Sequence, residues 1–311
     1  MKLPASSTKV VVFGSLNMDL VLRVPRAPEA GETLTARGFA THPGGKGANQ
    51  ALACARQGAQ VVMAGRVGDD AFGATLRASV LADGIDARHV QTTPGLPTGV
   101  ALIMVDDAAE NRISVVPGAN AALCAADADA LQGELANARL LMLQFEVPMP
   151  AVERAAELAH AAGCAVMLNP APAQPLPERL WQTVDILILN DSEAALLCDA
   201  AAGSSSIASN MALALQARGP RQVLLTMGGQ GLVLAQHGVV QYFPAMRVTP
   251  VDTTAAGDTF AGALCAALTL GDPMEDAIGR GVKAAALCVT RAGAQVSIPT
   301  RDEVDRFGAP G

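Results

Sequence analysis

The stretch RLLMLQFEVPMPAVERAAELAHAAGCAVML, residues 139–168, contains two short aliphatic runs separated by an alanine-rich segment. The runs at 139–145 and 164–168 are almost continuously apolar, which is typical of strands that are buried on both faces of a sheet. The segment between them, 150–162, has the composition of a helix. A strand, a helix and a second strand in this order favour a parallel sheet that is covered by helices on both faces.

The same alternation repeats on both sides of this stretch. Further aliphatic runs predict strands at 9–14, 61–64, 184–189 and 222–227. Helix-forming composition is found at 47–57, 70–83, 192–198, 207–218, 257–270 and 274–290. The chain is therefore predicted to have an α/β fold with a mainly parallel central sheet.

Two segments, 19–41 and 97–118, break this rhythm. They combine alternating apolar and polar residues with prolines and turn signals, which is typical of half-exposed antiparallel strands. We expect them to form a small sheet apart from the main one, either as a lid or as a contact between subunits. A pair of surface hairpins is the alternative, and composition does not decide between the two.

Composition excludes several classes of protein. The 311 residues carry a net charge of -7 and show no basic run with interleaved aromatic residues, so no nucleic-acid partner is expected. No apolar run reaches the roughly 18 residues of a membrane span, so no membrane partner is expected either. The six cysteines are scattered without CxxC pairs, which favours buried thiols in a reducing cytoplasm.

Polar and glycine residues directly follow several of the predicted strands. They are the segment GSLNMD at 14–19, then Glu146, Asn169, Asn190 and the glycine-rich loop 228–231. In open parallel sheets, ligands bind beyond the carboxyl ends of the strands. The recurrence therefore predicts a binding site at this edge of the sheet.

The segment DTTAAGDTF, residues 252–260, leads from a loop of small residues into a predicted helix. The unpaired amides at such a helix start form an anion hole, and the small side chains at 255–257 allow a phosphate to approach the backbone. A carboxylate in the first turn, Asp258, is then placed to accept a proton. The alternative is that Asp258 only caps the helix.

Three further loops each allow two interpretations. The segment HPGGKGANQ at 42–50 is a ligand loop or a tight helix start; it is neither a Walker loop nor a dinucleotide fingerprint. The segment GGQG at 228–231 is a hairpin turn or a loop that a nucleotide crosses. In NDSE at 190–193, Asn190 and Glu193 either cap a helix or face a phosphate-bound Mg²⁺ through water.

The order of these motifs closely resembles the ribokinase-like carbohydrate kinase family, from about residue 9 to 300. The resemblance is carried by GSLNMD (14–19), PGGKGANQA (43–51), NPAPA (169–173), NDSE (190–193), DTTAAGDTFAGA (252–263) and VTRAGAQ (289–295). It implies a single α/β domain, 1–311, with a doubly wound central sheet. It also implies a β-sheet lid, formed by about 19–41 and 97–118, through which two copies form a homodimer.

The resemblance also implies the site residues. The sugar pocket is expected to contain Asn17, Asp19, Gly45, Lys46, Asn49 and Glu146, together with the base Asp258. The anion hole is expected at Ala255, Ala256 and Gly257. ATP is expected to bind at Asn190, Glu193, Thr226, Gly228, Gly229, Gly231, Gly257 and Val282. A monovalent-cation site is expected at Asp252, Thr254, Val289, Ala292, Ala294 and Ser297.

The activity implied by the resemblance is transfer of the ATP γ-phosphoryl group to the 5-hydroxyl of D-ribose, with Mg²⁺ as cofactor and K⁺ as activator. A kinase for another sugar, such as deoxyribose or fructose, or for a nucleoside is the alternative. A protein that kept the fold for ligand sensing but lost catalysis is disfavoured by the intact Asp258, Gly257 and Asn190. An NAD-dependent oxidoreductase is disfavoured by the missing fingerprint.

Overall fold

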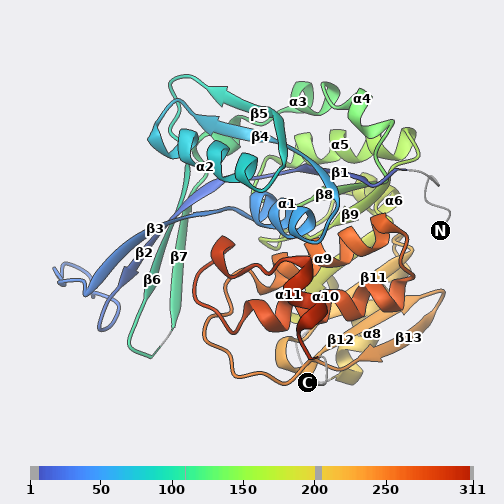
Figure 1. The fold of residues 1–311 in the computed structure, drawn as a ribbon. Coiled ribbons are helices and arrows are strands. Elements are labelled where there is room, and N and C mark those ends of the chain that lie inside the picture. Colours follow the sequence, from blue (N-terminus) through green and yellow to red (C-terminus); the bar gives the residue numbers. More distant parts are fainter. Residues whose placement is uncertain (1–6, 109, 200–204, 309–311) are drawn as a thin grey trace.

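The computed structural model describes residues 7–108, 110–199 and 205–308, which form two sheets with helices on both faces of the larger one (Figure 1). The larger sheet has nine strands in the order β13-β12-β11-β10-β9-β8-β1-β4-β5. The strands are β1 (Lys9–Phe13), β4 (Gln60–Gly68), β5 (Asp86–Thr93), β8 (Leu140–Leu143), β9 (Ala165–Leu168), β10 (Ile186–Asn190), β11 (Gln222–Thr226), β12 (Leu232–Gln236) and β13 (Val239–Phe243). From β5 to β11 neighbouring strands are parallel, and β12 and β13 pair antiparallel at one edge.

The strand order reverses between β1 and β8. From β1 the chain proceeds to β4 and β5 on one side, and from β8 it proceeds to β9, β10 and β11 on the other. This is the doubly wound arrangement that the resemblance implied, and it is confirmed. The crevice beyond the carboxyl ends of β1 and β8 is the place where such sheets bind ligands.

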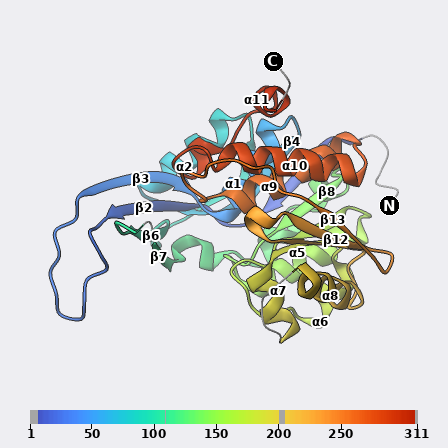
Figure 2. The ribbon, with the colours of Figure 1, turned by 90° about the horizontal axis from the view of Figure 1, so that it is seen from below.

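Helices cover both faces of this sheet, as Figure 2 shows with the sheet between two helical layers. One layer contains α1 (Lys46–Arg56), α2 (Ala71–Ala82), α9 (Ala256–Leu270) and α10 (Met274–Cys288), whose buried residues share a core with that face of the strands. The other contains α3 (Ala125–Asp129), α4 (Gln132–Leu135), α5 (Met149–Ala161), α6 (Glu178–Thr183), α7 (Asp191–Cys198) and α8 (Ser205–Gln216). The helix α11 (Arg301–Arg306) and the short helices η1 (Gly118–Ala122), η2 (Gly228–Gln230) and η3 (Gln295–Ser297) complete the chain.

Small residues bring α1 and α9 close together. A Cβ atom at Gly262 would lie 2.4 Å from the Cβ of Ala53, so only glycine fits at this crossing. The thiol of Cys54 donates to the carbonyl of Gly262 at 3.2 Å, which marks the same contact. The close approach places the amino-terminal turns of the two helices side by side, and these turns carry the predicted sugar loop and Asp258.

The smaller sheet projects from the body of the molecule (Figures 1 and 2). It consists of β2 (Asn17–Arg23), β3 (Gly38–Gly44), β6 (Gly99–Val105) and β7 (Asn111–Val116), in the order β3-β2-β6-β7. The small separate sheet is thus confirmed, but the expectation that its strands are all antiparallel is wrong, because β2 and β6 pair in parallel. Each of these two strands follows a parallel strand of the main sheet and runs outward from its carboxyl edge, so both leave in the same direction.

No helix in the described ranges is long and apolar enough to cross a membrane. All six cysteines are free; Cys54, Cys164, Cys265 and Cys288 are buried, whereas Cys124 is exposed. The cytoplasmic location expected from the scattered cysteines stays a prediction.

Candidate active site

Asp258 lies in the first turn of α9 and is 8 % exposed. Its carboxylate accepts two hydrogen bonds from α1: Nδ2 of Asn49 donates to Oδ2 and Nε2 of Gln50 donates to Oδ1, each at 3.0 Å. No side chain caps α9, so the interpretation of Asp258 as a helix cap is wrong. The carboxylate is instead held at the junction between the two helices.

The backbone before Asp258 has the geometry of an anion site. Ala255 precedes the helix in the left-handed region, with φ 61°. The amide of Ala256 donates to the carbonyl of Thr253 at 3.2 Å, whereas the amides of Gly257 and Asp258 have no acceptor in the described part of the chain. Among the described residues the amides of Ala255, Gly257 and Asp258 are therefore the free donors at this helix start, and the anion hole at 255–257 stays a prediction.

Glu146 joins the ends of the two strands at the switch point. Its Oε2 atom accepts hydrogen bonds from the Ser15 hydroxyl at 2.6 Å, the Lys46 amide at 3.0 Å and Nδ2 of Asn17 at 3.2 Å. Asn17 is in turn fixed by Asn120, whose Nδ2 donates to Oδ1 of Asn17 at 2.8 Å. The carboxylate is thus oriented through one oxygen, while the other oxygen has none of these contacts.

Asp19 and Lys46 lie in the same electrostatic environment. Burial, together with the charges of Glu146 and Asp258, raises the pKa of Asp19 to about 7, although Lys46 opposes the change. Burial lowers the pKa of the Lys46 ammonium, but four carboxylates outweigh it and leave that pKa above its usual value; they belong to Asp258, Glu146, Glu193 and Asp19. The site therefore concentrates negative charge around one cation, as suits a ligand rich in hydroxyl donors.

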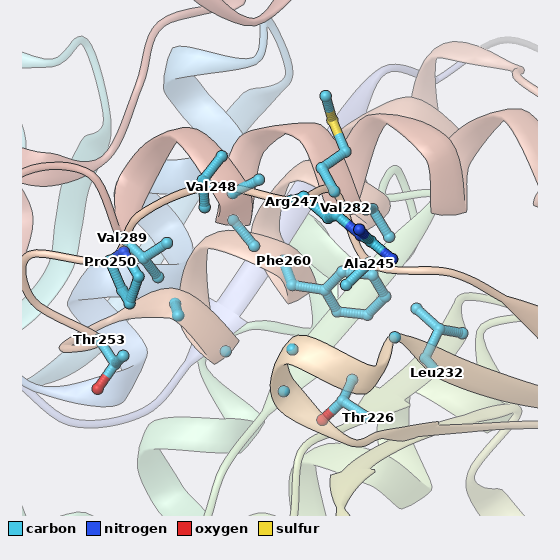
Figure 3. Close-up of a pocket in the computed structure, with 18 residues that line it drawn as sticks. Thr226, Leu232, Ala245, Arg247, Val248, Pro250, Thr253, Phe260, Val282 and Val289 are labelled. Carbon is cyan, nitrogen blue, oxygen red and sulfur yellow. The ribbon is translucent and has the colours of Figure 1, made fainter. Parts of the chain in front are cut away.

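A cavity of about 610 Å³ opens beside the start of α9 (Figure 3). The end of β11 and the start of β12 line one side through Thr226 and Leu232, and α10 and the residue that follows it line the other through Val282 and Val289. Phe260 of α9 lies between them. Of the predicted ATP residues, the cavity contacts Thr226, Gly228, Gly229, Gly231, Gly257 and Val282, but not Asn190 or Glu193. This apolar cavity thus reaches the residue next to Asp258.

Comparison with known proteins identifies the family. The model of the pfkB family carbohydrate kinases matches residues 7–301. The chain belongs to the pfkB family of carbohydrate kinases. It is 38 % identical to a ribokinase of Haemophilus influenzae over 298 residues, covering 96 % of this chain and 97 % of that one. It is 40 % identical to a ribokinase of Schizosaccharomyces pombe over 306 residues, covering 95 % and 96 %.

A solved structure supports the same assignment. The structure of Arabidopsis thaliana ribokinase complexed with ribose and ATP superposes with a TM-score of 0.91 at 31 % identity, covering 97 % of this chain and 98 % of that one. The predicted family, fold and enzyme class of this carbohydrate kinase are thereby confirmed.

The NDSE segment of the kinase forms a reciprocal cap at the start of α7. Oδ1 of Asn190 accepts from the amide of Glu193 at 2.8 Å, and Oε2 of Glu193 accepts from the amide of Asn190 at 2.9 Å. The capping interpretation is therefore confirmed. Burial raises the pKa of the Glu193 carboxyl, although the hydrogen bond from the Asn190 amide and the charge of Lys46 oppose the change. A cap does not exclude a second role, because the Oε1 atom of Glu193 has no part in it.

The segment expected to bind a monovalent cation is held together by Asp252. Its Oδ1 accepts from the amide and hydroxyl of Thr254 at 2.9 and 2.6 Å, and its Oδ2 accepts from the amide of Gly293 at 2.9 Å. Burial alone would raise the pKa of Asp252, but these hydrogen bonds outweigh it and lower that pKa. The carbonyl of Val289 accepts from the amides of Val251 and Asp252 at 2.7 and 3.2 Å, and the carbonyl of Ala294 accepts from the amide and the hydroxyl of Ser297 at 3.2 and 2.7 Å.

Four side chains around the site were not predicted as site residues: Ser15, Gln50, Asn120 and Gln144. Ser15 and Gln50 stand inside the motifs GSLNMD and PGGKGANQA, so their position in a motif was an available signal. Asn120 and Gln144 stand in no motif, and their contacts become visible only in the fold.

Proposed function

We propose that this carbohydrate kinase transfers the γ-phosphoryl group of ATP to the 5-hydroxyl of D-ribose. One observation carries the proposal: Asp258 accepts hydrogen bonds from Asn49 and Gln50 in the first turns of α1, and the preceding residue, Gly257, lines the apolar cavity. The carboxylate of Asp258, a proton acceptor, thus lies between polar side chains that suit a sugar and a pocket that suits a nucleotide. The similarity to ribokinases along almost the whole chain supports ribose as the acceptor.

In this mechanism Asp258 accepts the proton of the attacking hydroxyl. Phosphoryl transfer asks the protein mainly to align the reactants and to neutralise charge on the transferring oxygens. The free amides of 257 and 258, with the positive end of the α9 dipole, face the developing charge. Asn49 and Gln50 fix the carboxylate, so that it does not have to be oriented at the moment of reaction.

The sugar is proposed to bind between β2 and the start of α1. Glu146 and Asp19 accept hydrogen bonds from hydroxyl groups, and Oδ1 of Asn49, which is buried without a partner among the described residues, is a further acceptor. Asn17, Gly45 and Lys46 complete this side. A buried acceptor without a donor is costly, and a sugar hydroxyl supplies that donor.

ATP is proposed to place its base in the cavity near Val282 and its phosphates over the glycine loop 228–231 and Gly257. Mg²⁺ in such sites is held by one or two carboxylates together with phosphates and water, and it neutralises phosphate charge. Glu193 fits this role through its Oε1 atom, with Asn190 beside it. No group of three or more His, Cys, Asp and Glu side chains that could hold a metal ion is found among the described residues. The phosphates of ATP are proposed to supply further ligands.

A monovalent cation such as K⁺ is proposed to bind beside the helix start. The ligands would be Asp252, Thr254 and the segment that carries Val289, Ala292, Ala294 and Ser297, mostly through carbonyl oxygens. Because Asp252 ties Thr254 to Gly293, an ion here would stiffen the loop that leads into the anion site.

We propose that the chain is a single domain in which the four-stranded sheet is a lid over the sugar site. The same sheet is proposed to form the interface of a homodimer. In the strand register, Phe39, Leu102 and Val116 point to the same face of this sheet, and they are 64, 38 and 56 % exposed. Ile113 and Val115, which are 59 and 47 % exposed, point to the opposite face. Exposed apolar side chains of this kind favour association. Analytical ultracentrifugation of the wild type and of Phe39→Glu tests this: a wild-type monomer would contradict it.

The activity is tested by ADP release from MgATP with a panel of D-ribose, 2-deoxyribose, fructose and adenosine. We expect the highest kcat/KM with D-ribose and little release without sugar, because a closed site limits hydrolysis. A preference of tenfold or more for another acceptor (about 1.4 kcal/mol) would replace ribose as the substrate.

A further inference from the structure

A chain of amide side chains, in which Gln50 and Gln144 are buried and Asn169 is half-buried, leads from the sheet to Asp258. Nδ2 of Asn169 donates to the carbonyl of Ile188 at 3.0 Å, and Nε2 of Gln50 donates to Oδ1 of Asn169 at 3.1 Å. Nε2 of Gln144 donates to Oε1 of Gln50 at 2.7 Å. The same Nε2 of Gln50 donates to Oδ1 of Asp258. These contacts connect the carboxyl ends of β8, β9 and β10 with α1 and α9.

The direction of every hydrogen bond in this chain follows from one backbone group. The carbonyl of Ile188 only accepts, so Asn169 must turn its amino group toward it and its oxygen toward Gln50. Gln50 must then present its amino group to Asn169, and one amino group has two hydrogens, so the second is free for Asp258. A flipped Gln50 would place an oxygen against two acceptors.

Gln144 locks this orientation from the other side. Its amino group donates a hydrogen bond to Oε1 of Gln50, and both glutamines are fully buried. Its own Oε1 is buried without a partner among the described residues. A Cβ atom at Gly14 would lie 2.0 Å from that oxygen, so the side chain fits only because residue 14 is glycine. A buried polar atom without a partner costs stability, and such a cost is retained where it serves function.

We infer that Gln50 and Gln144 are positioning residues for Asp258: Gln50 aims the carboxylate, and Gln144 acts through Gln50. This inference rests on the proposed role of Asp258 as the base. With Asn49 on Oδ2 and Gln50 on Oδ1, both carboxylate oxygens are held by donors from the same helix. Small misalignments of reacting groups cost large factors in rate, so loss of one donor acts on turnover rather than on nucleotide binding.

The test compares Gln50→Met, Gln144→Met and the double variant with the wild type. Methionine keeps a similar shape but donates no hydrogen bond. We expect kcat with ribose to fall about 10–100-fold in Gln50→Met, while KM for ATP changes less than about threefold. Gln144→Met should also lower kcat, and the double variant should be no slower than Gln50→Met alone, because the two residues act in series.

Gln57→Met is the matched control. Gln57 is a buried glutamine that directly follows α1, at the end opposite to the one that contacts Asp258. Its Nε2 donates to the carbonyl of Pro299 at 3.0 Å. It should lower the melting temperature as much as Gln50→Met does but leave kcat within about twofold. Equal losses of kcat in both variants would reduce Gln50 to a structural residue and overturn the inference.

The outcomes separate this inference from the proposed function. A wild type that does not phosphorylate ribose refutes the function. An active wild type with an unchanged kcat in Gln50→Met, or additive losses in the double variant, refutes the inference alone. Should Gln50→Met not fold, Gln144→Met decides, since its side chain lies one hydrogen bond further from Asp258; a wild-type kcat there contradicts the inference.

Discussion

Nδ2 of Asn49 lies 3.0 Å from Oδ2 of Asp258, although the two residues are 209 positions apart in the sequence. The contact joins the motifs PGGKGANQA and DTTAAGDTFAGA, which the close approach of α1 and α9 brings together. The sugar loop and the anion site therefore form one structure, and changes in either should affect turnover.

Gly257→Ala should separate stability from activity. No heavy atom lies within 4 Å of a Cβ atom built at Gly257, and alanine is better than glycine in a helix by about 0.5–1 kcal/mol. The melting temperature should therefore stay the same or rise. The methyl group would occupy the space in which a phosphate approaches the amides, so kcat/KM for ATP should fall at least tenfold (about 1.4 kcal/mol).

The control for this variant is Gly279→Ala on α10, where a Cβ atom also meets nothing within 4 Å. It should give the same gain in stability with unchanged kinetics. If Gly257→Ala kept normal kcat/KM, the phosphate would not bind at this helix start.

Glu146→Gln should weaken sugar binding without unfolding the protein. The glutamine oxygen can still accept the hydrogen bonds of Ser15, Asn17 and the Lys46 amide, so the local structure should remain. The other oxygen becomes a donor and the charge is lost. Hydrogen bonds to charged groups contribute about 1.5–3 kcal/mol, so KM for ribose should rise about 10–100-fold. An unchanged KM, measured with saturating ATP, would remove Glu146 from the sugar site.

Asp19 should make stability depend on pH. Its pKa is about 7 in the folded chain against a reference value of 3.8. Below pH 4 the carboxyl is protonated in both states and has no effect. Between pH 4 and 7 the unfolded chain loses this proton and the folded chain keeps it, so rising pH lowers the free energy of unfolding. Above pH 7 this loss is constant, and it is at most about 1.4 kcal/mol for each unit by which the two pKa values differ.

Asp19→Asn removes this titration. The variant should therefore melt higher than the wild type at pH 8 and gain little at pH 4.5, whereas the exposed Asp69→Asn should leave the difference between the two pH values unchanged. Equal effects of Asp19→Asn at both pH values would show that the carboxyl is already ionised in the folded chain.

The cation site predicts activation by K⁺. Replacing K⁺ with tetramethylammonium should lower kcat several-fold, because a bulky organic cation does not fit among carbonyl oxygens. In Asp252→Asn an amino group replaces one carboxylate oxygen, so the side chain no longer accepts from both Thr254 and Gly293. The kcat of this variant should depend less on K⁺. Equal rates in the two salts would exclude a cation site at 252–254.

The sequence predicted the main sheet because its strands are continuous aliphatic runs, but it missed the edge strands β5 and β13. Their residues, DARHVQTT and VVQYF, are mixed and partly exposed, so they lack the signal of buried strands. Alternation in the smaller sheet showed that strands exist but not that β2 and β6 run in parallel. Direction depends on where each strand leaves the main sheet.

The motifs likewise located Asp258, Asn49 and Glu146 but not the groups that orient them. Gln144 contacts Gln50 across 94 positions of sequence, and no local pattern marks such a pair. The hydrogen bond from the amide of Ala256 to the carbonyl of Thr253 likewise becomes visible only in the folded loop.

The most direct test of the account is the rate of ribose phosphorylation by Asp258→Asn. The variant keeps the shape of the side chain and removes the proton acceptor, so kcat should fall about 10²–10⁴-fold while the protein stays folded. Asp276→Asn, in the exposed first turn of α10, serves as the control and should be fully active. A folded Asp258→Asn variant with a kcat near that of the wild type would contradict the central role of Asp258.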